Sequence, residues 1–292
     1  MQAARAYWQH LRLPFQLTLA PLFLWGCYLA PDRFGAGKGD AILGSIALHL
    51  FLYPGVTAFN SAYDRDTGPV AGMLCPPQVP PGLLPFSILW QAAGALLAGL
   101  VGATFLALYA AIALLAFAYS HPVTRWKADP VRSTLAVGLG QGALGFLAGW
   151  CAGAGDLGKA AGLAGLAGAM VAALTTIGLY PATQVFQIEE DAGRGDRTLA
   201  VVLGAPGALR LGSACLAAAA AIAAWLVAGR TGIGDGIVLA GIYLAVIGHN
   251  EIVARRLATP RTVHYAYVQA RRTGTIATTG FLLFVACQVG PW

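Results

Sequence analysis

The segment AILGSIALHLFLYPGVTAF, residues 41–59, is followed at once by NSAYDRD, residues 60–66. The first part is an apolar run of about the 20 residues that a helix needs to cross the hydrocarbon core of a bilayer. The second part carries an amide and two carboxylates, Asn60, Asp64 and Asp66. Ionisable residues at the end of a membrane helix are either solvated among the lipid headgroups or part of a polar site. The junction therefore predicts a membrane helix with a candidate site at its end.

A second acidic patch occurs in the other half of the chain, after the apolar run 161–186. It reads QIEED over residues 187–191 and continues to Asp196 and Arg197. One such patch alone is typical of a solvated loop. The chain has only 12 Asp and Glu residues, so two patches that each follow an apolar run favour a functional site over that interpretation.

The composition indicates a lipid environment. Hydrophobic residues make up 58% and charged residues 10% of the 292 positions, and the mean hydropathy is +0.67. Soluble globular domains average about 45–50% apolar and about 25% charged residues. The chain is therefore predicted to be a polytopic membrane protein. No segment is long enough for a soluble domain, so residues 1–292 are predicted to form a single membrane domain.

Apolar windows of spanning length recur along the chain, and the alternation typical of a membrane β-barrel is absent. The sequence predicts an all-α integral membrane protein, a bundle of nine transmembrane helices around a central cavity. Residues 84–120 are too many for one helix, so a tight turn near Gly102 and Ala103 is expected to divide them. The predicted spans are residues 11–30, 41–59, 84–103, 105–120, 134–152, 161–186, 208–228, 233–249 and 273–289.

The basic residues predict the orientation in the membrane. With the N-terminus in the cytoplasm, most of the 18 Lys and Arg residues fall on the cytoplasmic side, as the positive-inside rule expects. Both acidic patches and the basic stretch 125–132 then face the cytoplasm, and the C-terminal Trp292 lies on the opposite side. The formal net charge of +6 follows from this bias, so it does not indicate nucleic-acid binding.

The spacing of the polar residues indicates oxygen ligands for a metal ion. Asn60 and Asp64 are four residues apart, so a helix that continues past the membrane places both on one face. Gln187 and Asp191 repeat this spacing in the second patch. Magnesium prefers hard oxygen donors and is typically held by one or two carboxylates together with substrate phosphates. The two patches are therefore predicted to hold a diphosphate through magnesium. The cations predicted to neutralise the remaining phosphate charge are Arg125, Lys127 and Arg197.

These residues resemble two motifs of the UbiA-type intramembrane prenyltransferase family. The family's first motif, Asn-Asp-x-x-Asp-x-x-x-Asp after the second helix, corresponds to residues 60–68. Its second motif, Asp-x-x-x-Asp after the sixth helix, corresponds to residues 187–191. Residues 119–122, Tyr-Ser-His-Pro, are similar to the start of the family's loop after the fourth helix. The resemblance covers essentially the whole chain. The sequence departs from the motifs at Ser61, Gly68 and Gln187, where the family usually has Asp.

The resemblance implies that an isoprenyl group is transferred, within the membrane, from an isoprenyl diphosphate to an aromatic or other lipophilic acceptor. Magnesium is the implied cofactor, and the lipid bilayer surrounds the isoprenoid chain. The implied metal ligands are Asn60, Asp64, Gln187 and Asp191. The implied catalytic residues, which hold the leaving diphosphate, are Tyr119, Arg125 and Lys127. The implied substrate-binding residues are Asn60, Arg125, Lys127, Gln187 and Arg197.

Two other functions remain open from the sequence. An intramembrane terpene cyclase keeps the same ionisation of an isoprenyl diphosphate but needs no external acceptor, and the departures from the motifs leave room for it. A non-catalytic transporter or lipid-binding protein with a vestigial site is a third candidate. No charged residue lies near the centre of a predicted span, which argues against an ion-coupled carrier.

Overall fold

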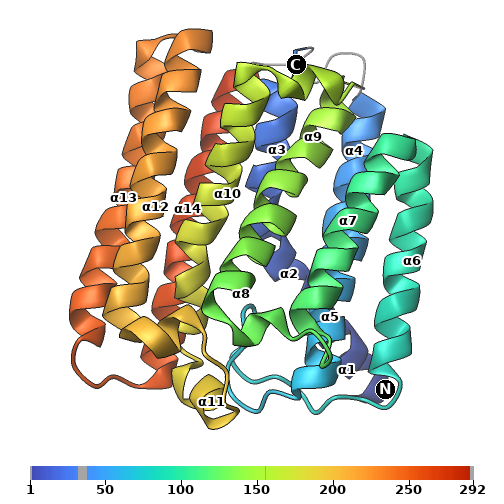
Figure 1. Cartoon of the computed structure of the whole chain (residues 1–292), viewed down its shortest axis with the longest axis vertical. Coiled ribbons are helices and arrows are strands. Elements are labelled where there is room, and N and C mark those ends of the chain that lie inside the picture. Colours follow the sequence, from blue (N-terminus) through green and yellow to red (C-terminus); the bar gives the residue numbers. More distant parts are fainter. Residues whose placement is uncertain (1, 32–37, 155, 290–292) are drawn as a thin grey trace.

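The computed structural model describes residues 2–31, 38–154 and 156–289, and these residues form helices joined by loops, with no strand among them (Figure 1). Trp292, predicted to lie outside the cytoplasm, is not among the described residues. The α-helices are α1 (Gln2–Leu11), α2 (Leu13–Gln16), α3 (Ala20–Leu29), α4 (Lys38–Ile46), α5 (Tyr53–Asp64), α6 (Leu83–Val101), α7 (Ala103–Ser120), α8 (Pro130–Val137), α9 (Gly145–Ala154), α10 (Leu163–Gln184), α11 (Ile188–Gly193), α12 (Leu199–Thr231), α13 (Ile233–Leu257) and α14 (Val263–Val289).

Two of the long rods are α-helices joined by a turn of π-helix. The π segment η2 (Ala47–Leu52) joins α4 to α5, and η4 (Gly138–Leu144) joins α8 to α9. Each rod crosses most of the height of the bundle. Within the described residues, 7 helices are long and apolar enough to span a membrane. They are Lys38–Asp64, Leu83–Val101, Ala103–Ser120, Pro130–Gly153, Leu163–Gln184, Leu199–Thr231 and Ile233–Leu257.

The first and last predicted spans differ from this pattern. Residues 11–30 are not one helix, because Arg12 has a left-handed backbone (φ 49°) and Pro14 and Pro21 begin new helical segments. The last span lies within α14, whose 27 residues are long enough, but Arg271 and Arg272 lower its hydropathy. The predicted all-helical membrane bundle is confirmed, and the count of nine spans is approximate.

The predicted turn within residues 84–120 is confirmed at its expected place. Gly102 separates α6 from α7 and has φ 145°, a conformation that residues with a Cβ rarely adopt. Gly232, at φ 122°, separates α12 from α13 in the same way. A single glycine in each case folds two membrane helices into an antiparallel hairpin.

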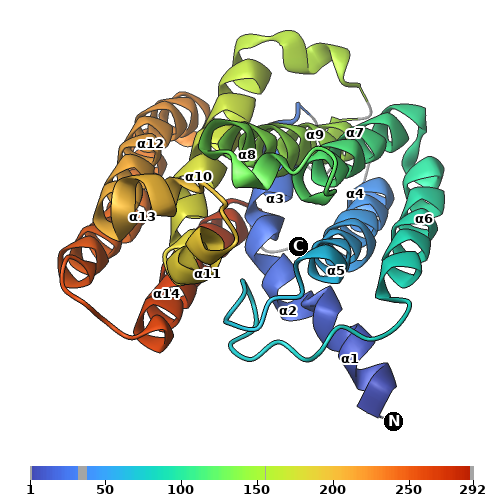
Figure 2. The same ribbon diagram turned by 60° about the horizontal axis from the view of Figure 1, so that its bottom comes forward.

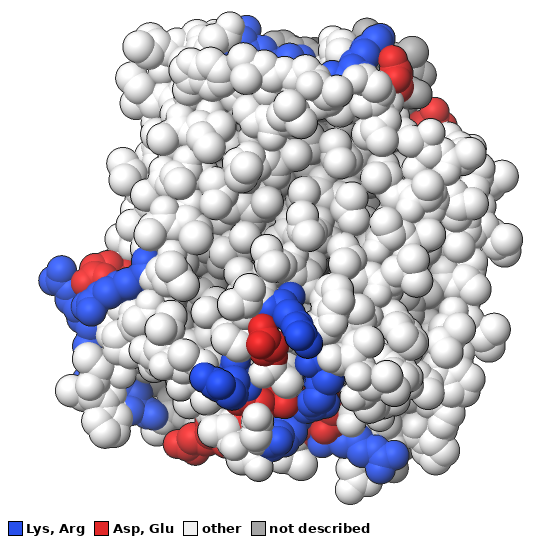
Figure 3. All heavy atoms as spheres, in the orientation of Figure 1, with Lys and Arg blue, Asp and Glu red and all other residues white. Residues whose placement is uncertain are grey.

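The surface is divided as a membrane protein requires. On the face shown in Figure 3, charged side chains lie at the upper end and over the lower half of the bundle, and a broad uncharged band lies between them. Large apolar side chains such as Leu89, Leu96, Leu100 and Leu114 are exposed on α6 and α7, where they would face lipid. The chain is therefore a multi-pass membrane protein.

The two largest apolar clusters of the core share the helix α3. Trp25 and Phe146 belong to a cluster with α10 and α12–α14, and Phe23 and Phe105 to a cluster with α4–α7. Viewed from the end that carries α1 and α11, the helices α3, α5, α7, α8, α10 and α14 surround a central region (Figure 2). The candidate site lies at this end.

Candidate active site

A cavity of about 480 Å³ runs into the bundle from the end that carries α11. Its inner walls are mainly apolar and include Trp25, Ile112, Leu179 and Leu216. Its outer end is polar and charged, and most of the side chains there come from α5 and the loop after it, the segment after α7, and the region of α10 and α11. The charged lining residues are Arg12, Asp64, Asp66, Lys127, Asp191, Arg194, Asp196 and Arg271.

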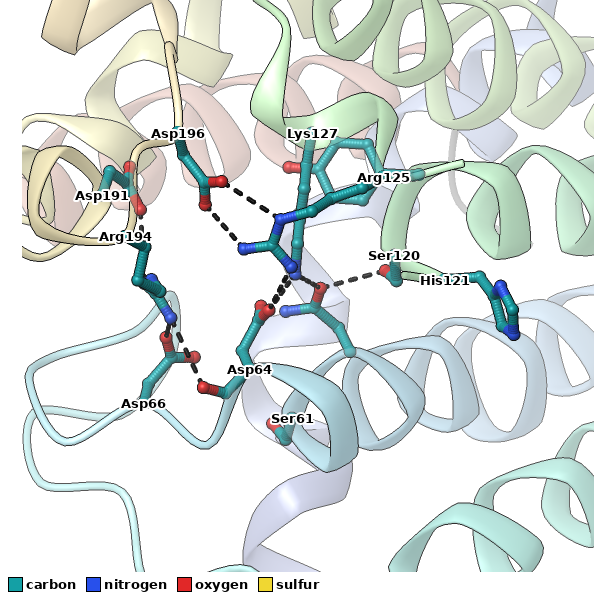
Figure 4. Close-up of polar contacts among 12 residues, drawn as sticks. Ser61, Asp64, Asp66, Ser120, His121, Arg125, Lys127, Asp191, Arg194 and Asp196 are labelled. Carbon is teal, nitrogen blue, oxygen red and sulfur yellow. Dashed lines mark hydrogen bonds and ion pairs between the residues drawn. The ribbon is translucent and has the colours of Figure 1, made fainter. Parts of the chain in front are cut away.

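The end of α5 supplies the first part of the charged region. Asn60 and Asp64 lie one helical turn apart, and the ammonium group of Lys127 reaches both. Figure 4 shows Lys127 and Asp64 pointing toward each other. Lys127 Nζ donates to Asn60 Oδ1 at 3.0 Å and also to Asp64 Oδ1. Ser120 Oγ donates to the same Asn60 oxygen at 2.9 Å. The predicted pair on one helix face is thus bound directly to a predicted cation.

The loop after α7 positions two cations over this face. Asp129 caps α8 by accepting from the backbone N–H groups of Val131 and Arg132 at 3.0 and 2.8 Å, which anchors the loop. Arg125 has a left-handed backbone (φ 38°) and donates to both oxygens of Asp196, from Nε at 3.1 Å and Nη2 at 2.9 Å. Its Nη1 lies 3.8 Å from Asp64 Oδ1. Arg125 therefore lies at the rim, linking the two acidic patches.

The second patch forms the short helix α11 and the turn after it. Gln187 precedes the helix, and its backbone carbonyl accepts from the Asp191 N–H at 2.8 Å. The Asp191 carboxylate accepts from Arg194 Nη2 and Thr198 Oγ1, both at 3.3 Å. Arg194 Nη1 donates to Asp66 at 2.7 Å, which joins the patches across 128 residues of sequence. The chain thus brings its two acidic patches to one cavity.

Burial shifts the protonation of this charged region. It raises the pKa of Asp191 to about 6 and raises that of Asp66, although Arg194 opposes both shifts. It lowers the pKa of Lys127, against the attraction of Asp64. In each case the loss of water disfavours the charged form. A charged ligand that enters here meets side chains that are poorly hydrated, so its interactions with them are stronger than in open solvent.

Two positions that depart from the family motif have partners of their own. Ser61 Oγ accepts from Arg12 Nη2 at 2.7 Å, so a buried arginine occupies the space beside this serine. A Cβ at Gly68 would lie 2.8 Å from Glu190 Oε2, so a side chain there would require the flexible Glu190 carboxylate to move. A charged side chain therefore lies beside each of these two positions.

The structure brings most of the predicted residues to the cavity but not all of them. Asn60, Asp64, Lys127, Gln187 and Asp191 line it. Tyr119 also lines it and shares a hydrogen bond with the Tyr180 hydroxyl at 2.8 Å. Arg197 is exposed and does not line the cavity, because the turn at Gly195 (φ 80°) carries it away, and its backbone N–H donates to Ala128.

Three cations that line the cavity, Arg12, Arg194 and Arg271, were not predicted from the sequence. Arg194 takes the place that was expected of Arg197, three residues further on. Arg12 lies inside the first predicted span, and a charge there is itself a sign of a functional position. Its guanidinium is buried and donates to Ser61 and to the Ala71 carbonyl. Neither the contact of Arg194 with Asp66 nor that of Arg12 with Ser61 can be predicted from the sequence around these residues.

The placement of Arg194 in the cavity, with Arg197 outside it, can be tested by ligand binding. We expect Arg194→Gln to raise the Kd for inorganic diphosphate by at least about 10-fold, because a charge-assisted contact to phosphate is lost. The matched variant Arg197→Gln should change this Kd by less than about twofold, as an exposed charge contributes little. Calorimetric titration of the detergent-solubilised protein with inorganic diphosphate measures both values. Equal losses in the two variants would contradict the placement of Arg194.

The cavity offers oxygen atoms of the kind that magnesium prefers as ligands. Among the described residues, no three His, Cys, Asp or Glu side chains form a ready metal cage. Asp64 and Asp191 nevertheless line one cavity as separate carboxylates, with the amides of Asn60 and Gln187 beside them. This set fits a magnesium ion that keeps several waters and takes its remaining ligands from substrate phosphates.

The fold and the site define a class: a multi-pass membrane protein with a deep apolar cavity and a charged end. The model of the UbiA prenyltransferase family matches residues 19–267. This range is most of the chain, and the protein belongs to the UbiA prenyltransferase family.

Individual relatives agree with this assignment. The chain is 30% identical over 149 residues to the protoheme IX farnesyltransferase of Aeropyrum pernix, an alignment that covers 49% of this chain and 48% of the relative. The chain therefore spans about half the length of the curated relative it matches. A UbiA homologue from Archaeoglobus fulgidus, bound to GPP and Mg²⁺, has a TM-score of 0.69 at 17% identity, covering 96% of this chain and 99% of that chain. A UbiA homologue from Aeropyrum pernix has a TM-score of 0.65 at 19% identity, covering 95% and 98%.

Proposed function

We propose that the protein transfers an isoprenyl group from an isoprenyl diphosphate to a lipophilic acceptor within the membrane, in a magnesium-dependent reaction. The observation that carries this proposal is the cluster of Asn60, Asp64 and Lys127 facing Asp191 and Arg194 across one cavity mouth. Behind this charged mouth lies an apolar cavity. An isoprenyl diphosphate has the same division, with a charged head and an apolar chain.

The chain's own cations bind and stabilise the diphosphate. Lys127 and Arg194 lie inside the cavity, and each exchanges its carboxylate partner for a phosphate oxygen when the donor enters. Arg125 supports the site from the rim, and the Tyr119 hydroxyl, close to the charged end, donates to the leaving group. These donors are in place before the reaction, so they stabilise the negative charge that develops as the allylic C–O bond breaks.

The magnesium ligands are proposed to be Asn60, Asp64, Gln187 and Asp191. Bound there, magnesium supplies Lewis-acid charge to the diphosphate oxygens and makes the diphosphate a better leaving group. The relative from Archaeoglobus fulgidus, solved with GPP and Mg²⁺, supports this choice of donor and metal. Asp191 can bind magnesium only as a carboxylate, so its carboxyl group must be deprotonated when the metal is bound.

The apolar part of the cavity has two tasks. Side chains such as Trp25, Ile112 and Leu216 surround the isoprenoid chain and exclude water from the allylic cation. The acceptor then forms a new C–C bond to this cation and loses one proton, which the released diphosphate takes up. By the distribution of Lys and Arg, the charged end and the N-terminus face the cytoplasm and the C-terminus the other side.

Diphosphate release tests the proposal. Purified protein in detergent is incubated with isoprenyl diphosphates of increasing chain length and candidate acceptors, with magnesium or with EDTA. We expect release with at least one donor, and a loss of at least about 100-fold when EDTA removes the metal. No release from any donor would refute the proposal. A cyclic hydrocarbon formed without acceptor would identify a cyclase instead.

A further inference from the structure

One face of α10 lines the cavity from the charged mouth to deep inside the bundle. Lining residues on this face recur every four positions, at Val171, Thr175, Leu179, Thr183 and Gln187. Gln187 lies at the mouth and Val171 at the inner end. With a rise of about 1.5 Å per residue, the cavity extends about 24 Å along this face. An isoprenoid chain whose diphosphate is held at the mouth therefore has to lie along α10.

The side chain of Tyr243 joins two walls of the cavity part of the way along this face. Tyr243 projects from α13, and its hydroxyl shares a hydrogen bond of 2.7 Å with Thr175 Oγ1 on α10. Both residues line the cavity, and the tyrosine is 8% exposed. The hydrogen bond fixes the ring, because a hydroxyl in apolar surroundings has no water to replace a lost partner. The bonded pair therefore narrows the cavity at the level of Thr175.

The cavity continues for about one helical turn beyond this pair. The helices α10 and α13 both run toward the mouth, and the residues four positions earlier, Val171 and Leu239, also line the cavity. Trp25 closes the space beyond them. Its indole N–H donates to the Gly168 carbonyl of α10 at 3.2 Å, and its side chain is only 2% exposed. A short apolar space thus lies between the tyrosine and the tryptophan.

The level of the pair sets a length for the isoprenoid chain. From Gln187 to Thr175 the face of α10 is about 18 Å long, and the diphosphate occupies its outer part. With C–C bonds of about 1.5 Å, an extended isoprene unit is about 5 Å long. The face therefore accommodates about three isoprene units before the chain reaches the pair. The turn beyond the pair adds about 5.4 Å, which is the length of one further unit.

We propose that Tyr243 limits the isoprenyl donor to three isoprene units, a farnesyl chain, and that Thr175 holds the tyrosine in place. The inference rests on the proposed prenyl transfer, because it assigns the chain length of the donor in the same cavity. The fourth unit of a longer chain meets the Tyr243 ring. Without the ring, the space up to Trp25 admits one more unit and excludes a second.

Binding of donor analogues with two to five isoprene units tests this limit. In these analogues sulfur replaces the oxygen that joins the diphosphate to the allylic carbon, so the bond ionises slowly and binding is measured without turnover. Calorimetry of the detergent-solubilised protein with magnesium gives each Kd. In the wild type, the four-unit analogue should bind at least about 10-fold more weakly than the three-unit analogue, because its last unit finds no apolar space.

Tyr243→Ala should move the limit by one unit. The four-unit analogue should bind at least about 10-fold more tightly than to the wild type, whereas the Kd of the three-unit analogue changes less than about threefold. The five-unit analogue should remain weak, since Trp25 still closes the cavity. An equal or lower wild-type Kd for four units than for three would overturn the inference, as would an unchanged series in Tyr243→Ala. Tyr243→Val carries the same test if the alanine variant does not fold.

Tyr109→Ala is the matched control. Tyr109 is also buried, at 3% exposed, and its hydroxyl donates to the Gln91 carbonyl at 2.6 Å, but it does not line the cavity. Its loss should lower Tm and leave the limit at three units. The same shift of the limit in Tyr109→Ala would overturn the inference, because the loss of any buried tyrosine would then loosen the cavity.

The chain limit and the proposed transfer fail in different ways. Binding with the expected limit, but no product from ordinary donors with any acceptor, would support the limit and refute the transfer. Product formed at equal kcat/KM from three-unit and four-unit donors would support the transfer and overturn the limit. No binding of any analogue would overturn both.

Discussion

Asp64→Asn is expected to lower the rate of the proposed magnesium-dependent diphosphate release by at least about 100-fold, because a proposed metal ligand and a preorganised charge are lost together. The substitution keeps the size of the side chain, so it does not open a cavity. Asp64 holds Lys127 through a direct ion pair and lies 3.8 Å from Arg125. Release is measured under single-turnover conditions with saturating magnesium, so that binding and bond breaking are separated.

The ion pair between Asp64 and Lys127 is tested with a double-mutant cycle. Lys127→Met alone should cause a similar loss of rate, since it removes the cation that faces the leaving group. The double variant should be little slower than either single variant, because groups that act as a unit lose their function together. Its Tm should exceed that of either single variant, since each single change leaves one buried charge without its partner. Losses that multiply in the double variant would show that the two side chains act independently.

Glu251→Gln is the matched control for Asp64→Asn. Glu251 also accepts from two arginines, Arg210 at 3.2 Å and Arg255 at 2.9 Å, but it lies on the exposed side of α13 and does not line the cavity. Its ion pairs are exposed, so they contribute little to stability. The rate of diphosphate release should change less than about twofold.

The sequence predicted which end of the bundle carries the site, because that depends only on where apolar runs stop. Asn60 and Asp64 share a face since helix geometry fixes residues four apart. The turn at Gly102 could be placed because 37 residues cannot form one span and glycine has the required freedom.

The rotation of each element about its axis could not be predicted in the same way. Arg194 and Arg197 are equally basic and three residues apart, and only the turn at Gly195 decides which one reaches the cavity. Arg12 pairs with Ser61 across 49 residues, a contact that depends on how α2 packs on α5.

Close packing of α3 on α9 sets the shape of the cavity wall, and it depends on two glycines. A Cβ at Gly149 would lie 1.9 Å from the Phe23 carbonyl oxygen, and a Cβ at Gly26 would lie 2.0 Å from the Phe146 carbonyl oxygen. The helices thus meet backbone to backbone, as small residues permit in membrane bundles. Because α3 also carries Leu22 and Trp25 into the cavity, any shift of this helix reshapes the substrate site.

We therefore expect Gly149→Ala to destabilise the protein by about 3 kcal/mol or more, since the atoms that must move are backbone and cannot change rotamer. This corresponds to a fall in Tm of at least about 6 °C, measured by thermal unfolding in detergent. Gly241→Ala on α13 is the control, because a Cβ there meets nothing within 4 Å. It should leave Tm unchanged or raise it slightly, as alanine favours a helix over glycine by about 0.5–1 kcal/mol. Equal Tm values for the two variants would mean that α3 and α9 do not touch at Gly149, and the cavity wall would then need another support.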